Sequence, residues 1–237
     1  MRWVLVLLLT AGCASATPEP IPTPPLPSAS ASASATASAS PAVADARITR
    51  IPPRQWDAMT RAGVVRAGCP LTRVDLRRVE VNFHTFKGEV ARGVLVVNRD
   101  VTEDVAAVFT DIFEAGFPMK SIRPIEVFGG DDNASMAANN TSAYNCRNAA
   151  QANSAAADSP HANGRAVDIN PVQNPWLDPR CDCFRPKATY APRTPGAGKI
   201  LSGGPVWRAF TRRGWIWQDL ATPDYQHFDT GYPSRPR

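Results

Sequence analysis

Residues 159–170 read SPHANGRAVDIN, and the other motifs of the chain relate to this stretch. It begins with small and polar residues around His161 and ends in an apolar run that contains Asp168. Gly164 lies between them and has more backbone freedom than any other residue, so a loop here can fold back toward a following strand. Burying an aspartate between valine and isoleucine is costly unless the carboxylate has a partner, and a metal ion is one such partner. The stretch therefore predicts a loop and a strand that bring His161 close to Asp168.

A second motif lies near the C-terminus, where residues 224–229 read DYQHFD. Catalytic zinc sites keep about three protein ligands and one open position, and they accept imidazole nitrogen and carboxylate oxygen. His161, Asp168 and His227 supply such a set. Asp224 precedes His227 by three residues and could act as a base beside the open position. The spacing alone is a loose pattern, because a single histidine or buried aspartate is more often purely structural.

The two motifs together resemble the zinc D-alanyl-D-alanine carboxypeptidase family. This family includes VanY-type carboxypeptidases and L-alanyl-D-glutamate endopeptidases, which share the Hedgehog/DD-peptidase fold. The resemblance rests on S-x-H-x-x-G-x-A-x-D at residues 159–168 and on a carboxylate-x-x-His-Phe sequence at residues 224–228. It extends over roughly residues 70–232, with further similarity in GVLVVN (93–98), NNTSAYNCR (139–147) and DINPVQNP (168–175). It implies zinc as cofactor and a peptidoglycan stem peptide as substrate.

The resemblance also assigns a role to Arg147, which lies ahead of the histidine loop. Similar enzymes carry an arginine there that stabilises the negative charge developing on the carbonyl oxygen. Ser159 could hydrogen-bond substrate or shape the loop, and Trp217 could contact substrate or pack in the core. Asp229 could support His227 or be a surface charge. His84, the remaining histidine, belongs to an expected hairpin and is left outside the site.

The N-terminus predicts export. Arg2 is followed by a short apolar run at residues 3–9, typical of a signal peptide. The small residues before Cys13 resemble a lipoprotein cleavage site, so residues 1–13 are expected to be a signal with a lipidated Cys13. An ordinary signal peptide, with secretion to the cell wall, is the alternative. Residues 14–46 are almost entirely Ala, Ser, Pro and Thr and predict a disordered tether. Residues 47–237 form the expected peptidase domain, anchored outside the cytoplasm.

The net charge of +5 suits an exported protein that meets anionic wall polymers. The chain has no nucleic-acid motif, so nucleic acid is not an expected partner, and a monomer is expected. Export also permits disulfides between the cysteines after Cys13. Cys181 and Cys183 are expected to be too close in sequence to pair with each other and to find partners in Cys69 and Cys146.

The hydrophobic pattern predicts a single α+β domain, an antiparallel sheet with flanking helices that carries the zinc site. A hairpin is expected from residues 74–86 and 89–98 around a Lys87–Gly88 turn. Asp100 and Glu103 predict a capping box for a helix that ends at Gly116. The remaining expected elements are helices at 54–62 and 205–213, a strand at 122–128 and a polar loop at 129–140.

Other functions remain possible from the sequence alone. An L-Ala-D-Glu endopeptidase would use the same ligands, and a non-catalytic, zinc-containing wall-binding module would not need Asp224. A serine hydrolase of the S-x-x-K type is disfavoured because no such sequence occurs. A Cys146–His161 dyad would leave Asp168 and His227 without a role.

Overall fold

The computed structural model describes residues 42–147, 155–217 and 222–236. The fold is α+β, as predicted, and all described helices and strands lie in the compact unit Pro41–Arg237. The expected signal segment, Cys13 and most of the expected tether lie outside the described residues. Within the described parts of the chain, no helix has the length and apolarity needed to cross a membrane.

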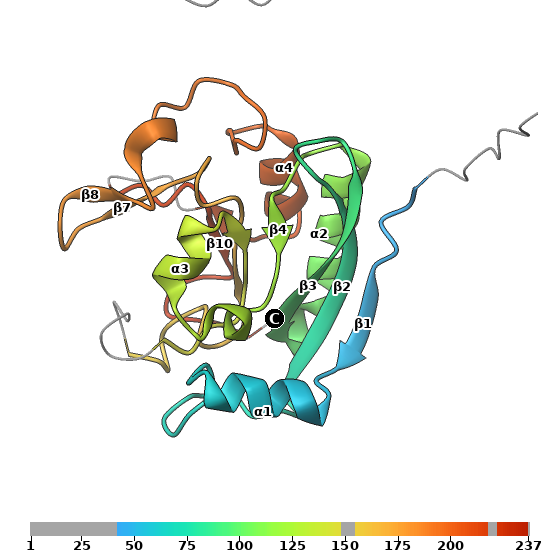
Figure 1. Cartoon of the computed structure of the whole chain (residues 1–237), viewed down its shortest axis with the longest axis vertical. Helices are drawn as coiled ribbons and strands as arrows, with labels where there is room; N and C mark the ends of the chain where they lie inside the picture. Colours follow the sequence, from blue (N-terminus) through green and yellow to red (C-terminus); the bar gives the residue numbers. More distant parts are fainter. Residues whose placement is uncertain (1–41, 148–154, 218–221, 237) are drawn as a thin grey trace, which may run out of the picture. The chain divides into compact units, whose positions relative to one another are not determined.

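The first sheet is the predicted hairpin with one added edge strand. β2 (Leu76–His84) pairs antiparallel with β3 (Val90–Asn98), and β1 (Arg47–Arg50) pairs with the other edge of β2. Alternate residues of β2, among them Val79 and Val81, are fully buried because successive side chains of a strand point to opposite faces. These residues pack against α2 (Thr102–Glu114), which runs along the hairpin in Figure 1.

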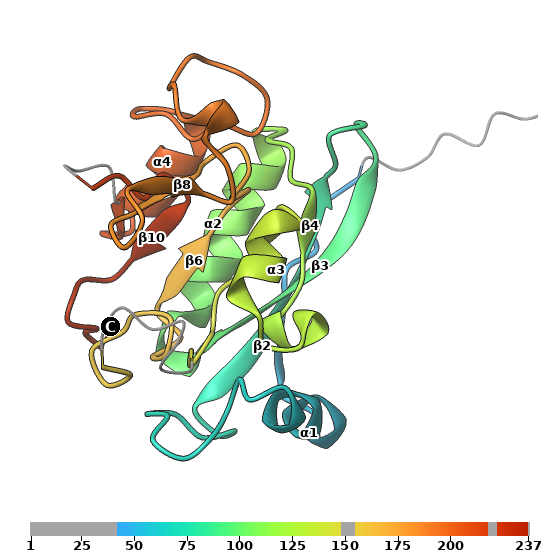
Figure 2. The same ribbon diagram turned by 60° about the vertical axis from the view of Figure 1, so that its left-hand side comes forward.

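The second sheet carries the C-terminal motif. β10 (His227–Asp229) is its central strand, with β6 (Ala166–Asp168) on one side and β9 (Ile216–Trp217) on the other. α4 (Pro205–Thr211) packs against both α2 and β9, so the two helices connect the first sheet with the second (Figure 2). One hydrophobic core, to which both sheets contribute, therefore fixes β6 and β10 relative to the rest of the unit.

Shorter elements complete the fold. They are α1 (Pro53–Arg61), η1 (Arg99–Val101), β4 (Ser121–Ile122), η2 (Ile125–Phe128), α3 (Asp132–Ala137), β5 (Asn140–Thr141), β7 (Trp176–Asp178), β8 (Cys183–Arg185) and η3 (Ala188–Tyr190).

The expectation for residues 122–140 was wrong in two places. Only Ser121–Ile122 form a strand, and Ile125–Phe128 form a 3-10 turn instead. Pro124 precedes this turn and Gly129 ends it at a positive φ of 65°, so proline and glycine outweigh the apolar pattern. The expected polar loop contains α3, because the Asp131 side chain accepts a hydrogen bond from the Ala134 N–H and caps a short helix.

The predicted capping box does not form, although the helix does. α2 begins one residue later than expected, and its N-cap residue Val101 makes no side-chain cap bond. The carboxylate of Asp100 instead accepts hydrogen bonds from Nε and Nη2 of Arg165, the latter at 2.6 Å. This pair ties the start of α2 to the loop that precedes β6.

The disulfides also differ from the expectation. Cys69 pairs with Cys146, and Cys181 pairs with Cys183 across only one intervening residue. Asp182 has a φ of 49°, in the left-handed region, and this turn brings the Cα atoms of Cys181 and Cys183 to 5.2 Å. Closeness in sequence therefore did not prevent pairing, because the left-handed turn at Asp182 brings the two cysteines together.

The described structure begins slightly before the expected domain boundary. The Ala44 carbonyl accepts a hydrogen bond from the Asn82 N–H at 2.7 Å, and Ala44 is buried. Residues 42–46 therefore contact β2 although their composition continues that of the expected tether.

Candidate metal site

The loop before β6 folds into a compact turn that presents His161. The Gly164 N–H bonds to the His161 carbonyl, and the Arg165 N–H bonds to the Pro160 carbonyl at 2.8 Å. Gly164 has a positive φ of 64°, and a Cβ atom there would lie 2.5 Å from the Asn98 nitrogen. A glycine is therefore required on both conformational and steric grounds.

Three predicted ligands meet at one point. The antiparallel register places His227 directly opposite Asp168, and the loop adds His161. Their ligand atoms lie within 4.8 Å of one another, and all three residues are buried. Nε2 of His161 lies 3.3 Å from Oδ2 of Asp168, and Nδ1 of His227 lies 3.0 Å from Oδ1 of the same carboxylate.

The remaining nitrogen of each histidine has its own acceptor. Nδ1 of His161 lies 2.7 Å from the Ala143 carbonyl oxygen, and Nε2 of His227 lies 3.0 Å from Oδ2 of Asp229. These oxygens can only accept, so each of these ring nitrogens carries a hydrogen and donates it. In the neutral rings, the other two nitrogens are then lone-pair acceptors. Metal-binding histidines are oriented in this way.

The cluster therefore fits a metal ion. Nε2 of His161 and Nδ1 of His227 face each other at 3.0 Å. Two acceptors at this distance, beside a carboxylate, repel one another unless a proton or a cation lies among them. Burial alone would raise the pKa of Asp168, but the two histidines hold it well below its usual value. The donor set of two imidazoles and one carboxylate is the one zinc uses in many hydrolases.

Asp224 lies beside this cluster with an unused acceptor. Its Oδ1 atom is enclosed and has no hydrogen-bond partner among the described residues. Burial raises the pKa of Asp224 to about 7; His227 and Arg147 work against this shift, and the charge of Asp168 adds to it. A carboxylate with such a pKa can both accept and release a proton near neutral pH.

Arg147 is held by two carboxylates. Its Nε donates to Oδ2 of Asp132 at 2.9 Å, and its Nη2 lies 4.0 Å from Oδ2 of Asp168. Burial alone would lower the pKa of Arg147, but Asp132 and Asp168 raise it. The guanidinium therefore stays charged at the edge of the metal cluster. Asp132 belongs to α3, in the stretch expected to be a loop, so its role could not be read from the sequence.

A cleft of about 450 Å³ opens onto the cluster. Its lining includes His161, His227, Asp224, Arg147 and Ser159. The hydroxyl of Ser159 accepts a hydrogen bond from the Ala162 N–H at 3.3 Å and thus shapes the loop while facing the cleft.

One predicted substrate residue, Trp217, lies elsewhere, and His84 lies outside the site as expected. Trp217 is not part of the cleft lining among the described residues; it packs against the core, and its Nε1 donates to the Tyr225 carbonyl at 2.9 Å. His84 stacks on Phe113 at the first sheet, apart from the site.

The cleft also contains residues that the sequence analysis did not select. They are Asp132, Asn133, Met136, Pro160, Trp176, Asp178, Arg180, Cys181, Arg185 and Gln226. Several belong to the β7–β8 hairpin. The signal in the sequence for these hairpin residues was the density of charged residues near Cys181 and Cys183.

A buried His–Asp–His cluster with an adjacent carboxylate and a fixed arginine defines the class of site as that of a metal-dependent hydrolase. The family model described as D-alanyl-D-alanine carboxypeptidase matches residues 152–230, which confirms the resemblance to the zinc D-alanyl-D-alanine carboxypeptidase family. The matched segment contains both motifs but not Arg147. Neither a curated protein nor a solved structure matches the chain.

Proposed function

We propose that the protein is a zinc-dependent D-alanyl-D-alanine carboxypeptidase that acts on peptidoglycan stem peptides outside the cytoplasm. The family match supports a peptidase of this type. The observation that carries the proposal is the position of Asp224, which places a carboxylate with a pKa of about 7 and an unpaired oxygen beside the ligand cluster.

His161, Asp168 and His227 would hold the zinc. When bound, the ion supplies Lewis acidity, which polarises a substrate carbonyl and lowers the pKa of water. Asp224 takes one proton from the attacking water and passes it to the amine nitrogen as the C–N bond breaks. Arg147 donates to the carbonyl oxygen that gains negative charge during attack. One water is consumed, and free D-alanine is released.

The proposed location follows from the N-terminus. A lipid on Cys13 would anchor the domain at the cell membrane, and residues 14–41 would provide reach toward the wall. The stem peptide is the proposed partner, the protein works as a monomer, and no nucleic acid is involved. A wall-binding module without catalysis would have no use for Asp224, and this argues for an enzyme.

The test uses purified protein and two pentapeptides, one ending in D-Ala-D-Ala and the other its all-L counterpart. We expect one zinc per molecule by elemental analysis, release of D-alanine from the first peptide only, loss of release with a chelator and recovery with zinc. Mass spectrometry of the products separates the alternatives, because internal fragments without free D-alanine indicate an endopeptidase. Equal cleavage of both pentapeptides would exclude the stem-peptide assignment.

A matched pair of variants tests the metal ligands. His161→Ala with His227→Ala should bind no zinc, whereas His84→Ala, outside the cluster, should retain it. Unchanged zinc in the double variant would remove these residues from the ligand set.

A further inference from the structure

The β7–β8 hairpin forms one wall of the cleft. β7 and β8 pair antiparallel, with Trp176 opposite Arg185 and Asp178 opposite Cys183. The Cys181–Cys183 disulfide closes the tip of the hairpin. Backbone hydrogen bonds also hold β7 to the segment before Asp224, since the Leu177 N–H donates to the Pro223 carbonyl at 2.8 Å. The hairpin is thus fixed relative to the proposed base.

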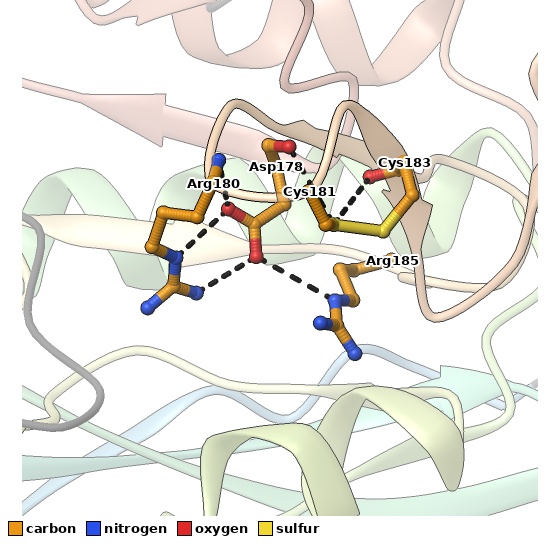
Figure 3. The surroundings of a disulfide bond; sticks show 5 residues. All are labelled: Asp178, Arg180, Cys181, Cys183 and Arg185. Carbon is orange, nitrogen blue, oxygen red and sulfur yellow. Dashed lines mark hydrogen bonds and ion pairs between the residues drawn. A yellow bond between two sulfur atoms is a disulfide. The ribbon is translucent and has the colours of Figure 1, made fainter.

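Two arginines of this hairpin share one buried carboxylate. Nε and Nη2 of Arg180 donate to the two oxygens of Asp178, each at 2.8 Å. Nε of Arg185 lies 3.5 Å from Oδ2 of the same carboxylate. Figure 3 shows the Asp178 carboxylate between the two guanidinium groups. Two cations thus share a single anion, which leaves one positive charge unbalanced within this group.

Both guanidinium groups keep donors available. The side chains of Arg180 and Arg185 are 49% and 43% exposed, whereas that of Asp178 is 1% exposed. Nη1 of Arg180 and both Nη atoms of Arg185 have no hydrogen-bond partner among the described residues. Both residues line the cleft that leads to the metal ligands. Arg180 also lies over the Trp176 ring, 5.6 Å from its centroid, which limits its freedom.

Arg147, the other arginine that lines the cleft, is already paired with carboxylates of the protein. Asp132 and Asp168 already neutralise it at the edge of the metal cluster. The hairpin group is the part of the cleft lining in which two guanidinium groups contact one carboxylate, although Asp132 also raises the pKa of Arg180. Planar guanidinium groups with unused N–H donors match a carboxylate, which can accept two hydrogen bonds at once.

We propose that Arg180 and Arg185, positioned by Asp178, form a subsite that binds a carboxylate of the peptide substrate. This inference rests on the proposed function for the identity of the ligand as a peptide. The carboxylate comes either from the C-terminus of the peptide or from an internal acidic residue such as glutamate. Binding at this subsite orients the peptide along the cleft with respect to Asp224 and the metal ligands.

The test compares Arg180→Gln, Arg185→Gln and the double variant with the intact protein. Arg54→Gln is the matched control, because it removes the same charge from an exposed position on α1, outside the cleft lining. Each cleft variant should weaken peptide binding about tenfold, the effect of one charge-assisted hydrogen bond. The turnover number should change by less than about threefold, because the interaction is equal in ground and transition states. Arg180→Lys should recover part of the affinity.

Three peptides identify the carboxylate. The first is a pentapeptide with an internal glutamate that ends in D-Ala-D-Ala, the second is its C-terminal amide, and the third has the glutamate carboxylate amidated. The intact protein should discriminate against one of the two amides, which assigns the source of the carboxylate. The double variant should bind that amide and the parent peptide equally well. A purely structural role for the arginines would weaken all three peptides alike and would overturn the inference.

Peptide binding is measured by calorimetry and catalysis by release of D-alanine. The subsite and the proposed reaction can therefore be refuted independently. If no peptide is cleaved but carboxylate-dependent binding is present and disappears in the double variant, the subsite stands and the proposed reaction falls. The opposite result is also possible: D-alanine is released, the amides bind as tightly as the parent peptide, and the arginine variants bind as tightly as the intact protein. In that case the subsite is refuted and the proposed reaction stands. Absence of binding by every peptide would also overturn the subsite.

Discussion

Asp229 accepts a hydrogen bond from Nε2 of His227 at 3.0 Å, while its other oxygen accepts one from the Gly231 N–H at 2.7 Å. This arrangement fixes the ring so that Nδ1 faces the metal position. Asp229→Ala should weaken metal affinity about 10- to 100-fold, as loss of such a partner does in other metal sites. Competition with a chelator of known affinity measures the change. Asp229→Asn keeps an acceptor oxygen and should lose less; an equal loss in both variants would show that charge rather than orientation matters.

Asp224→Asn should retain both fold and metal but lose turnover. The amide has the same shape as the carboxylate but cannot take a proton from water, and general base catalysis contributes about 100- to 10,000-fold. The measurement is D-alanine release per bound zinc. Asp158→Asn, a nearby acidic residue outside the cleft lining, serves as the control. Near-full activity of Asp224→Asn would assign the base elsewhere.

Arg147→Lys should lower the turnover number more than it changes the Michaelis constant. Lysine keeps the charge but loses the planar set of donors that reaches both Asp132 and the cleft. If Arg147 acts on the charge that develops during attack, its loss appears mainly in the chemical step. Steady-state kinetics give both parameters, and a change confined to the Michaelis constant would indicate a binding role instead.

Asp132→Ala should produce a similar but smaller defect through Arg147. Asp132 accepts from Nε of Arg147 and so positions the guanidinium without being proposed to touch the reacting atoms. The double variant Asp132→Ala with Arg147→Lys should then be little worse than Arg147→Lys alone. Additive defects would show that Asp132 acts independently.

The two disulfides should differ strongly in their effect on stability. Cys69–Cys146 closes a segment with a sequence separation of 77, so loop entropy predicts a loss of about 4.5 kcal/mol when it is removed. Cys181–Cys183 has a separation of 2 and restricts the unfolded chain far less. Denaturant unfolding of the two Cys→Ser pairs, measured with metal present, tests this contrast. Equal losses would show that unfolded-state entropy does not account for the stabilisation.

Much of the fold follows from local patterns. The apolar repeat at Val105, Val108 and Ile112 predicts α2, and alternation at Val79 and Val81 predicts β2, because both patterns are long and regular. Residues 122–128 were misassigned because Pro124 and Gly129 interrupt a short apolar run. The capping box failed for a different reason: Arg165, distant in sequence, takes the carboxylate of Asp100.

The meeting of His161, Asp168 and His227 could be predicted because metal chemistry admits few residue types and because the resemblance supplied their spacing. Their partners were only partly predictable: Asp229 was proposed as a support for His227 and accepts its Nε2–H, whereas the partner of His161 was not foreseen. Ala143 contributes only a backbone carbonyl to His161, and a backbone contact leaves no side-chain pattern from which it could be predicted. The role of Asp178 depends on pairing of two short strands, so it becomes visible only when the hairpin is seen in three dimensions.

The register between β6 and β10 links metal binding to correct folding. His227 lies directly opposite Asp168, so both side chains emerge on the same face of the sheet. A slip of one residue would turn one of them to the opposite face and separate the two ligands. The geometry of the site thus depends on the correct register of two short strands that lie far apart in the sequence. If the cluster binds a metal ion, a misaligned chain would bind it less well, which would give the correctly paired form a thermodynamic advantage whenever metal is available.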